Sequence, residues 1–296
     1  ALIFNKINIC DWSAKKDFQK VKNELGIKGN EIMPFYGLAL EDNPKNQLIR
    51  SINYSKNRLE KFSNKKQTFN VYKNKKIKVG YYSSDFFDHA TMYLISGLLR
   101  EHNKDQFEIM VFNYGKNKPT EFVNETMKNV NLFKDISNFP DLEVVKLSRD
   151  LKIDIAIDLK GFTHNSRSKL FAYRLAPIQI NFLGYPGSLG SSFIDYIIAD
   201  KTLIPDNYRE NYSEKIIYLS NSYQPNDEKR EISKIKTKKE DFGFPQYSKI
   251  LSCFNSTYKI TTEELEIWSR ILNKVENTYL WLIKTNDIAE KNLINF

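Results

Sequence analysis

The sequence predicts an α/β protein built around a largely parallel sheet. From residue 77 onward, short apolar segments alternate with segments of helical period, an order that is typical of repeated βαβ units. The short segments are mainly apolar, as expected of strands that are buried on both faces of a sheet. The same pattern restarts near residue 250, so we expect two Rossmann-like lobes joined by a polar linker.

The first 75 residues are predicted to form a helical connector. Apolar side chains recur at helical spacing from Trp12 to Leu25, and Gly26 would end that helix. A second helix is expected after the turn at residues 42–44. The lysine-rich residues 63–76 then form a polar approach to the first strand.

The remaining chain divides into a first Rossmann-like lobe over residues 76–222 and a linker with the start of a second lobe over residues 223–296. Residues 221–239 are polar and of mixed charge, which suggests a hinge. The predicted strands are 77–82, 107–114, 132–136, 153–159, 178–183, 196–199, 250–254 and 279–283, with a further edge strand at 215–219. The predicted helices are 91–101, 119–130, 141–151, 166–173 and 262–274.

Composition limits the classes of function. The chain has 296 residues and a formal charge of +9, from 45 Lys and Arg against 36 Asp and Glu. This sign would suit nucleic acid, an anionic membrane surface or a phosphorylated substrate. We favour an ordinary solvated basic surface, and expect no nucleic-acid or membrane partner. No apolar run approaches the roughly 18 residues of a membrane span.

The chain ends and the cysteines bear on compartment. Two cysteines cannot form a disulfide framework, so a reduced, cytoplasmic setting is expected. The first residues show no secretory signal and no initiator Met, and the sequence is interpreted as a piece of a longer protein.

His89 is the first candidate for chemistry. It follows the strand at 77–82 and stands at the entrance of the next helix, where ligands bind in open α/β sheets. A helix N-terminus disfavours the imidazolium, and a neutral ring can act as a general base, an effect worth about 10²–10⁴-fold. The alternative is a capping or surface residue. Asp85 and Asp88 could orient the ring, although a role within the turn is favoured for either alone.

The other two histidines are weaker candidates. His164 also follows an apolar strand, within GFTHNSR, and could contact substrate. His102 is expected to face solvent at a helix end.

A glycine-rich loop follows the strand IQINFL. Gly184 to Gly190 reads GYPGSLG, which lacks the spacing of a dinucleotide fingerprint. The glycines could serve a tight turn, or could let a ligand approach free backbone N–H groups. The residues alone do not separate these two readings.

Lys259 is the best candidate for a phosphate contact. Thr261 and Glu264 match a capping box, so a helix is predicted to start directly after this lysine. A helix N-terminus beside an ammonium group makes an anion site suited to a diphosphate. Asn255 and Ser256 could add polar contacts, and an ordinary surface lysine is the alternative. The sequence has no residue cluster at metal-ligand spacing, so no metal is expected.

These segments together resemble the catalytic region of the protein O-linked N-acetylglucosamine transferases and their SPINDLY-type relatives. The resemblance is carried by KIKVGYYSSDFFDHAT, DIAIDLKGFTHNSR, RLAPIQINFLGYPGSLGSSFIDYIIAD, YSEKIIYL and FNSTYKITTEELEIWSRIL, in the same order. The segments ICDWS and FYGLALEDNPKNQL resemble that family's connector between tetratricopeptide repeats and catalytic region.

The resemblance implies a GT-B fold, with two Rossmann-like lobes and the donor between them. It implies inverting transfer of N-acetylglucosamine from UDP-GlcNAc to Ser or Thr hydroxyls of proteins, without a metal. By motif, His89 matches the histidine proposed as base or as organiser of the acceptor site. Lys259 matches the lysine that stabilises the leaving diphosphate. The backbone around the donor sugar corresponds to Leu183 and Gly184, and the neighbouring Tyr185, Pro186 and Gly187 are carried with them.

The chain departs from the family pattern in places. Ala90 replaces the usual proline, and Ser256 stands where many relatives have glutamine. The segment that grips the nucleotide would lie beyond Phe296, and tetratricopeptide repeats would precede residue 1. The chain is therefore expected to hold the acceptor-side lobe and only the first strands of the donor-side lobe, and to bind donor poorly or to be inactive by itself.

Two alternatives stay open. The same fold could use GDP-fucose or UDP-glucose, or asparagine as acceptor. The chain could instead be a non-catalytic basic module that binds an acidic partner. The sequence predicts no particular oligomeric state.

Overall fold

The computed structural model describes residues 2–28, 31–63, 69, 72–116 and 118–296. Its strands are β1 (Ile77–Ser83), β2 (Phe107–Asn113), β3 (Leu132–Asp135), β4 (Ile155–Asp158), β5 (Ile178–Asn181), β6 (Tyr196–Ala199), β7 (Lys215–Tyr218), β8 (Lys249–Cys253) and β9 (Thr278–Leu282). Its α-helices are α1 (Leu2–Asn8), α2 (Ser13–Val21), α3 (Pro34–Leu38), α4 (Pro44–Arg58), α5 (Ala90–Glu101), α6 (Glu121–Met127), α7 (Asp141–Asp150), α8 (Lys169–Ala172), α9 (Thr262–Lys274) and α10 (Asp287–Ile294). Short 3₁₀ helices lie at Glu60–Phe62, Asp206–Asn211, Lys239–Phe242 and Thr257–Lys259.

The chain forms two compact units, whose bounds differ from the three segments expected from the sequence. The larger unit comprises Gly26–Gly37 and Asp42–Arg230. The smaller unit comprises Ala1–Leu25, Leu38–Glu41 and Glu231–Phe296. The expected connector is thus divided between the two units, and part of its lysine-rich end lies outside the described residues.

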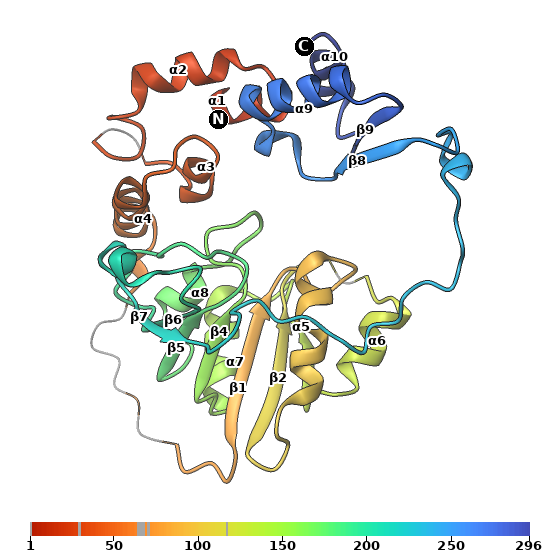
Figure 1. Ribbon diagram of the computed structural model, residues 1–296. Helices are drawn as coiled ribbons and strands as arrows, with labels where there is room; N and C mark the ends of the chain where they lie inside the picture. Colours follow the sequence, from red (N-terminus) through yellow and green to blue (C-terminus); the bar gives the residue numbers. More distant parts are fainter. Residues whose placement is uncertain (1, 29–30, 64–68, 70–71, 117) are drawn as a thin grey trace. The chain divides into compact units, whose positions relative to one another are not determined.

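The larger unit contains a seven-stranded sheet in the order β3-β2-β1-β4-β5-β6-β7 (Figure 1). Every neighbouring pair is parallel, which confirms the parallel α/β fold predicted from the apolar strands. The strand order changes direction between β1 and β4, which pair directly with Tyr82 opposite Asp158. Such a switch point is where open α/β sheets bind ligands, at the carboxyl ends of the strands.

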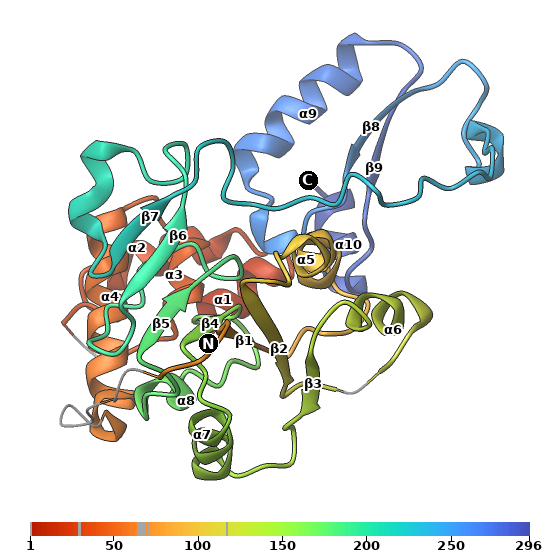
Figure 2. The ribbon, with the colours of Figure 1, turned by 90° about the horizontal axis from the view of Figure 1, so that it is seen from below.

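Helices cover both faces of this sheet (Figure 2). Met92, Ile95 and Leu99 of α5 pack with Val123 of α6 on one face. Residues of α7 and α8 pack on the other face, around Tyr82, Phe112 and Ala156 of the strands. Because both faces are covered, β1 is buried from Val79 to its end, as expected of a largely apolar strand in a parallel sheet.

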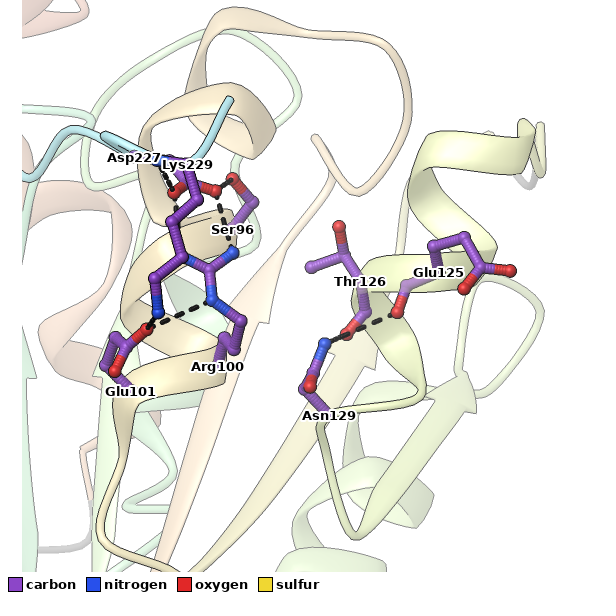
Figure 3. Close-up of polar contacts among 8 residues, drawn as sticks. All are labelled: Ser96, Arg100, Glu101, Glu125, Thr126, Asn129, Asp227 and Lys229. Carbon is purple, nitrogen blue, oxygen red and sulfur yellow. Dashed lines mark hydrogen bonds and ion pairs between the residues drawn. The ribbon is translucent and has the colours of Figure 1, made fainter. Parts of the chain in front are cut away.

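The start of the linker is fixed to α5 within the larger unit (Figure 3). Asp227 accepts two hydrogen bonds from the Arg100 guanidinium, at 2.9 and 2.7 Å, and Lys229 pairs with Glu101 at 2.7 Å. Gly97 allows this approach, because a Cβ there would lie 3.1 Å from Cγ of Asp227. The predicted hinge is therefore anchored in its first part, whereas residues 231–243 are exposed.

The smaller unit is built on β8 and β9, which are parallel, with α9 and α10 beside them. The N-terminal helices join this unit: Thr257 donates a hydrogen bond to the carbonyl of Asn8 at 2.7 Å, and the rings of Trp12 and Phe296 lie 5.2 Å apart. The sequence predicted a helix from Trp12 to Leu25, of which α2 covers the part up to Val21, but it did not predict this partner. Among the described residues, no helix has both the length and the apolar character needed to cross a membrane.

Candidate functional site

The loops that follow β1, β4 and β5 form the candidate site of the larger unit. They carry His89, Lys160 and the segment from Leu183 to Gly187, all at the carboxyl edge of the sheet. The Lys160 ammonium group lies 2.6 Å from Oδ2 of Asp85, so an ion pair joins the β1 loop to the β4 loop across the switch point.

His89 is the N-cap residue of α5, as its position at the helix entrance predicted. Its Nδ1 accepts a hydrogen bond from the backbone N–H of Thr91 at 3.2 Å. The side chain is 40% exposed, and the ring lies 5.4 Å from that of Phe87. The cap therefore orients the ring while leaving part of it accessible.

Of the two neighbouring aspartates, only Asp85 approaches the ring. Its Oδ2 lies 3.6 Å from Nδ1 of His89, whereas Asp88 accepts hydrogen bonds from Tyr93 and Thr120, each at 3.3 Å. Asp85 also serves the turn, because its backbone N–H bonds to Oγ of Ser83 at 3.0 Å. Asp85 thus lies within the turn, and its carboxylate is near the ring without a hydrogen bond to it, so its role in orienting His89 stays a prediction.

Lys160 and Asp158 were not singled out from the sequence, and both lie in the site. Lys160 is 6% exposed and Asp158 is 1% exposed. Both residues flank Leu159 at the end of an apolar strand that is expected to be buried. Charged side chains are rarely buried without a partner. Two charges at such a position could therefore have indicated a functional site from the sequence.

Burial raises the pKa of Asp158 to about 6. The backbone N–H groups of Lys160 and Gly161 donate hydrogen bonds to Oδ1, which lowers the pKa and partly offsets the effect of burial. Oδ2 has no hydrogen-bond partner among the described residues. The same holds for the buried hydroxyl of Tyr114 and for Oδ1 of Asn181, the residue opposite Asp158 in β5. Unpaired polar atoms of this kind are costly and are typical of functional sites.

The glycine-rich loop is held mainly by contacts inside the protein. A Cβ on Gly184 would lie 2.1 Å from the carbonyl oxygen of Leu159, so packing alone requires glycine there. The side chain of Tyr185 is fully buried, and its hydroxyl accepts a hydrogen bond from Gln47 of α4 at 2.7 Å. Only the backbone of Tyr185 could meet a ligand, whereas Pro186 and Gly187 are partly exposed.

Leu183 carries backbone strain. Its φ is +74°, and the N–H of Gly184 bonds back to the carbonyl of Phe182 at 3.0 Å, which defines a tight γ-turn centred on Leu183. Left-handed φ values in non-glycine residues are uncommon and gather at functional sites. The predicted contact of this backbone with the donor sugar stays a prediction that this strain supports.

The two other histidines differ from each other. His164 is exposed in the loop after β4, which leaves it accessible to a ligand. His102 was expected to face solvent, and this is wrong: its Nε2 lies 2.8 Å from the hydroxyl of Tyr81, and burial lowers its pKa. The ring packs beside Phe107, because the helix end turns back onto β1 and β2.

Lys259 lies in the smaller unit, at the end of a 3₁₀ helix and three residues before α9. It is exposed, with its ammonium group 6.0 Å from the ring centroid of Tyr258. The predicted capping box is confirmed, because the carboxylate of Glu264 accepts from the N–H of Thr261 at 2.9 Å. Asn255 and Ser256 are exposed in the loop after β8.

The helix N-terminus beside Lys259 already carries negative charge. Glu263 forms an ion pair with Lys15 of α2, and that hydrogen bond lowers the pKa of Glu263 to about 2. A pocket of about 400 Å³ adjoins this helix start, lined by Trp12, Phe18, Tyr258 and residues 261–264 among others. An anion at α9 would therefore depend on the Lys259 ammonium group as well as on the helix.

His89 and residues 183–187 follow strands of the same parallel sheet in the larger unit, while Lys259, Asn255 and Ser256 belong to the smaller unit. That the two groups share one crevice stays a prediction. In the described part of the chain, no three or more His, Cys, Asp and Glu side chains form a group that could hold a metal ion.

Comparisons with known proteins agree with this architecture. The defining pattern of glycosyl transferase family 41 matches residues 50–240 and 225–296. The probable UDP-N-acetylglucosamine–peptide N-acetylglucosaminyltransferase SEC of Arabidopsis thaliana is 34% identical over 71% of this chain, and the SPINDLY protein of Solanum lycopersicum is 31% identical over 68%. The chain spans only 22% of the length of each.

A solved structure of the Thermobaculum terrenum O-GlcNAc transferase superposes on 98% of this chain with a TM-score of 0.77 and 20% identity, covering 56% of that protein's chain. This likeness confirms the α/β fold of GT-B type that the resemblance implied. With the family pattern matched over most of its length, the chain belongs to glycosyl transferase family 41.

Proposed function

We propose that this chain is the acceptor-side part of a glycosyltransferase that moves N-acetylglucosamine from UDP-GlcNAc to Ser or Thr hydroxyls of proteins. Membership of glycosyl transferase family 41 is the observation that carries the proposal. The names of the relatives support the donor and a peptide acceptor. The two free cysteines fit a cytoplasmic protein.

In the proposed reaction, the acceptor oxygen bonds to the anomeric carbon of the sugar with inversion. The bond from that carbon to the diphosphate breaks, UDP leaves with the electron pair, and the proton of the hydroxyl passes to the departing diphosphate or to water. His89 would meet the acceptor or sugar, because its partly exposed ring stands at the carboxyl end of β1. The strained backbone at Leu183 and Gly184 would hold the donor sugar.

Lys259 would stabilise the leaving diphosphate, where negative charge accumulates. The exposed ammonium group and the start of α9 supply positive potential without a metal, so none is assigned. Asn255 and Ser256 would contact the same nucleotide end, and His164 the acceptor side.

The first test separates the donors. The full-length protein is titrated with UDP-GlcNAc, UDP-glucose and GDP-fucose by calorimetry, and its transfer to Ser-, Thr- and Asn-containing peptides is followed by mass spectrometry. Preferential binding of UDP-GlcNAc and modification of Ser or Thr are expected. Preference for another donor, or modification of Asn, would replace this proposal by the related transferase.

The second test uses Lys259→Ala in the full-length protein, with Lys274→Ala as its matched control, because Lys274 is exposed at the opposite end of α9. Loss of a group that stabilises transition-state charge costs about 10²–10³-fold in turnover. We expect that loss only in Lys259→Ala. Equal effects of both variants, together with partner binding that weakens steeply with salt, would favour the non-catalytic basic module.

A further inference from the structure

Two groups in the larger unit compete for one nitrogen of His89. The backbone N–H of Thr91 lies 3.2 Å from Nδ1, and Oδ2 of Asp85 lies 3.6 Å from the same atom. A backbone N–H can only donate and a carboxylate can only accept. The two contacts therefore demand opposite states of Nδ1, a lone pair for Thr91 and a proton for Asp85.

The observed distances favour the lone pair. The Thr91 contact is within hydrogen-bond range, whereas the Asp85 contact is beyond it. A neutral imidazole whose Nδ1 accepts a hydrogen bond carries its proton on Nε2. Because Nδ1 faces the helix cap, Nε2 is the ring nitrogen that remains for a ligand.

The ion pair with Lys160 explains why Asp85 does not require a proton on Nδ1 of His89. The Lys160 ammonium group donates to Oδ2 of Asp85 at 2.6 Å, which is the carboxylate oxygen nearest His89. The other oxygen accepts from Oγ of Ser84 at 3.1 Å. The side chains of Lys160 and Asp85 are only 7% and 9% exposed, so water cannot readily replace either partner. Without Lys160, a buried carboxylate would need another donor, and His89 is adjacent.

We propose that Lys160 and Asp85 are positioning residues that select the tautomer of His89, with Nδ1 capping α5 and the Nε2–H group directed to the ligand. Under the proposed sugar transfer, on which this role rests, His89 then acts as a hydrogen-bond donor that orients the acceptor or sugar. It does not act as the general base in this state, because Nε2 already carries its proton. The tautomer itself can be measured without any transfer activity.

The experiment is long-range ¹H–¹⁵N NMR of the chain labelled with ¹⁵N at the histidine rings, which separates protonated ring nitrogens from those with a lone pair. The chain has three histidines, so His102→Gln and His164→Gln assign the signals. Near neutral pH, we expect His89 to show a lone pair on Nδ1 and a proton on Nε2. A proton on Nδ1 in the parent protein would overturn the proposal.

Three variants test the cause. In Lys160→Met, a proton is expected on Nδ1, with loss of the Thr91 hydrogen bond. In Lys160→Met combined with Asp85→Asn, the carboxylate is gone and the parent tautomer should return. Lys160→Arg keeps the charge and should also keep the parent tautomer, while His102 serves as an unchanged internal reference.

A folded Lys160→Met protein that retains the parent tautomer would refute selection by Lys160. If Lys160→Met does not fold, the other two variants still test the proposal. A proton on Nδ1 of His89 in Lys160→Arg, or in the double variant, would contradict it. Transfer kinetics of the full-length protein add a separate readout: kcat should be lower in Lys160→Met and restored in Lys160→Arg, in parallel with the tautomer. Absence of transfer in the full-length parent protein would instead count against the proposed function and leave the NMR result intact.

Discussion

Replacing Asp158 by asparagine should stabilise the larger unit at neutral pH. Asp158 is fully buried, and burial raises its pKa from 3.8 to about 6. A difference of about 2 in pKa corresponds to about 3 kcal/mol, at 1.36 kcal/mol for each unit. This is an upper limit, because the amide oxygen in Asp158→Asn accepts more weakly from the N–H groups of Lys160 and Gly161.

The sign follows from proton binding. Between about pH 4 and pH 6 the folded protein holds a proton on Asp158 that the unfolded chain has lost, so stability falls as pH rises through this window. Above this pH window Asp158 is ionised in the folded protein, and the buried charge lowers the free energy of unfolding by its full amount. Asp158→Asn removes that cost, and its new N–H groups have unpaired acceptors nearby in Tyr114 and Asn181.

The assay is urea unfolding at about pH 4 and about pH 7.5, with Asp105→Asn as a control at an exposed turn. At the upper pH we expect the free energy of unfolding of Asp158→Asn to exceed that of the parent by about 1–3 kcal/mol, and at the lower pH we expect little difference. The control should change by less than about 0.5 kcal/mol at both. Equal stability of Asp158→Asn and parent at the upper pH, or the same gain at both, would refute this reasoning.

Two further predictions concern packing. Gly184→Ala should lower stability by more than about 3 kcal/mol in thermal unfolding, because its Cβ would overlap the Leu159 carbonyl; a shift below about 1 kcal/mol would contradict that close approach. Arg100→Met should expose the linker at Lys229 to trypsin about 10–100-fold faster, since a charged hydrogen bond contributes about 1.5–3 kcal/mol. Lys104→Met, at an exposed position near the same helix end, is the control, and equal cleavage rates would show that the Asp227 contact does not hold the linker.

Local sequence patterns were sufficient for most elements of the fold. Short, mainly apolar segments predicted β1 to β6, and helical periodicity with a capping box predicted α9 to its first residue. The short α10 was missed, because its N-cap at Asn286 follows a polar segment with little periodicity. The membership of residues 1–25 in the smaller unit was also missed, since the hydrogen bond from Thr257 to Asn8 spans most of the chain.

The candidate site was only partly predictable. The place of His89 follows from local order, because a strand, a polar turn and a helix put it at the cap. The roles of Lys160 and Asp85 depend on a pairing across β1 and β4, which are separated by two other strands in sequence. No pattern of spacing within either segment indicates that pair.

The sequence by itself determined the alternation of strands and helices, the cap position of His89 and the resemblance to family 41. Tertiary structure alone decided which charges meet at the switch point. The physical reason is that burial and a long-range partner, not residue type, set the protonation of Asp158 and the hydrogen bonds of Asp85. These properties arise only when the β1 and β4 loops are brought to the same edge of the sheet.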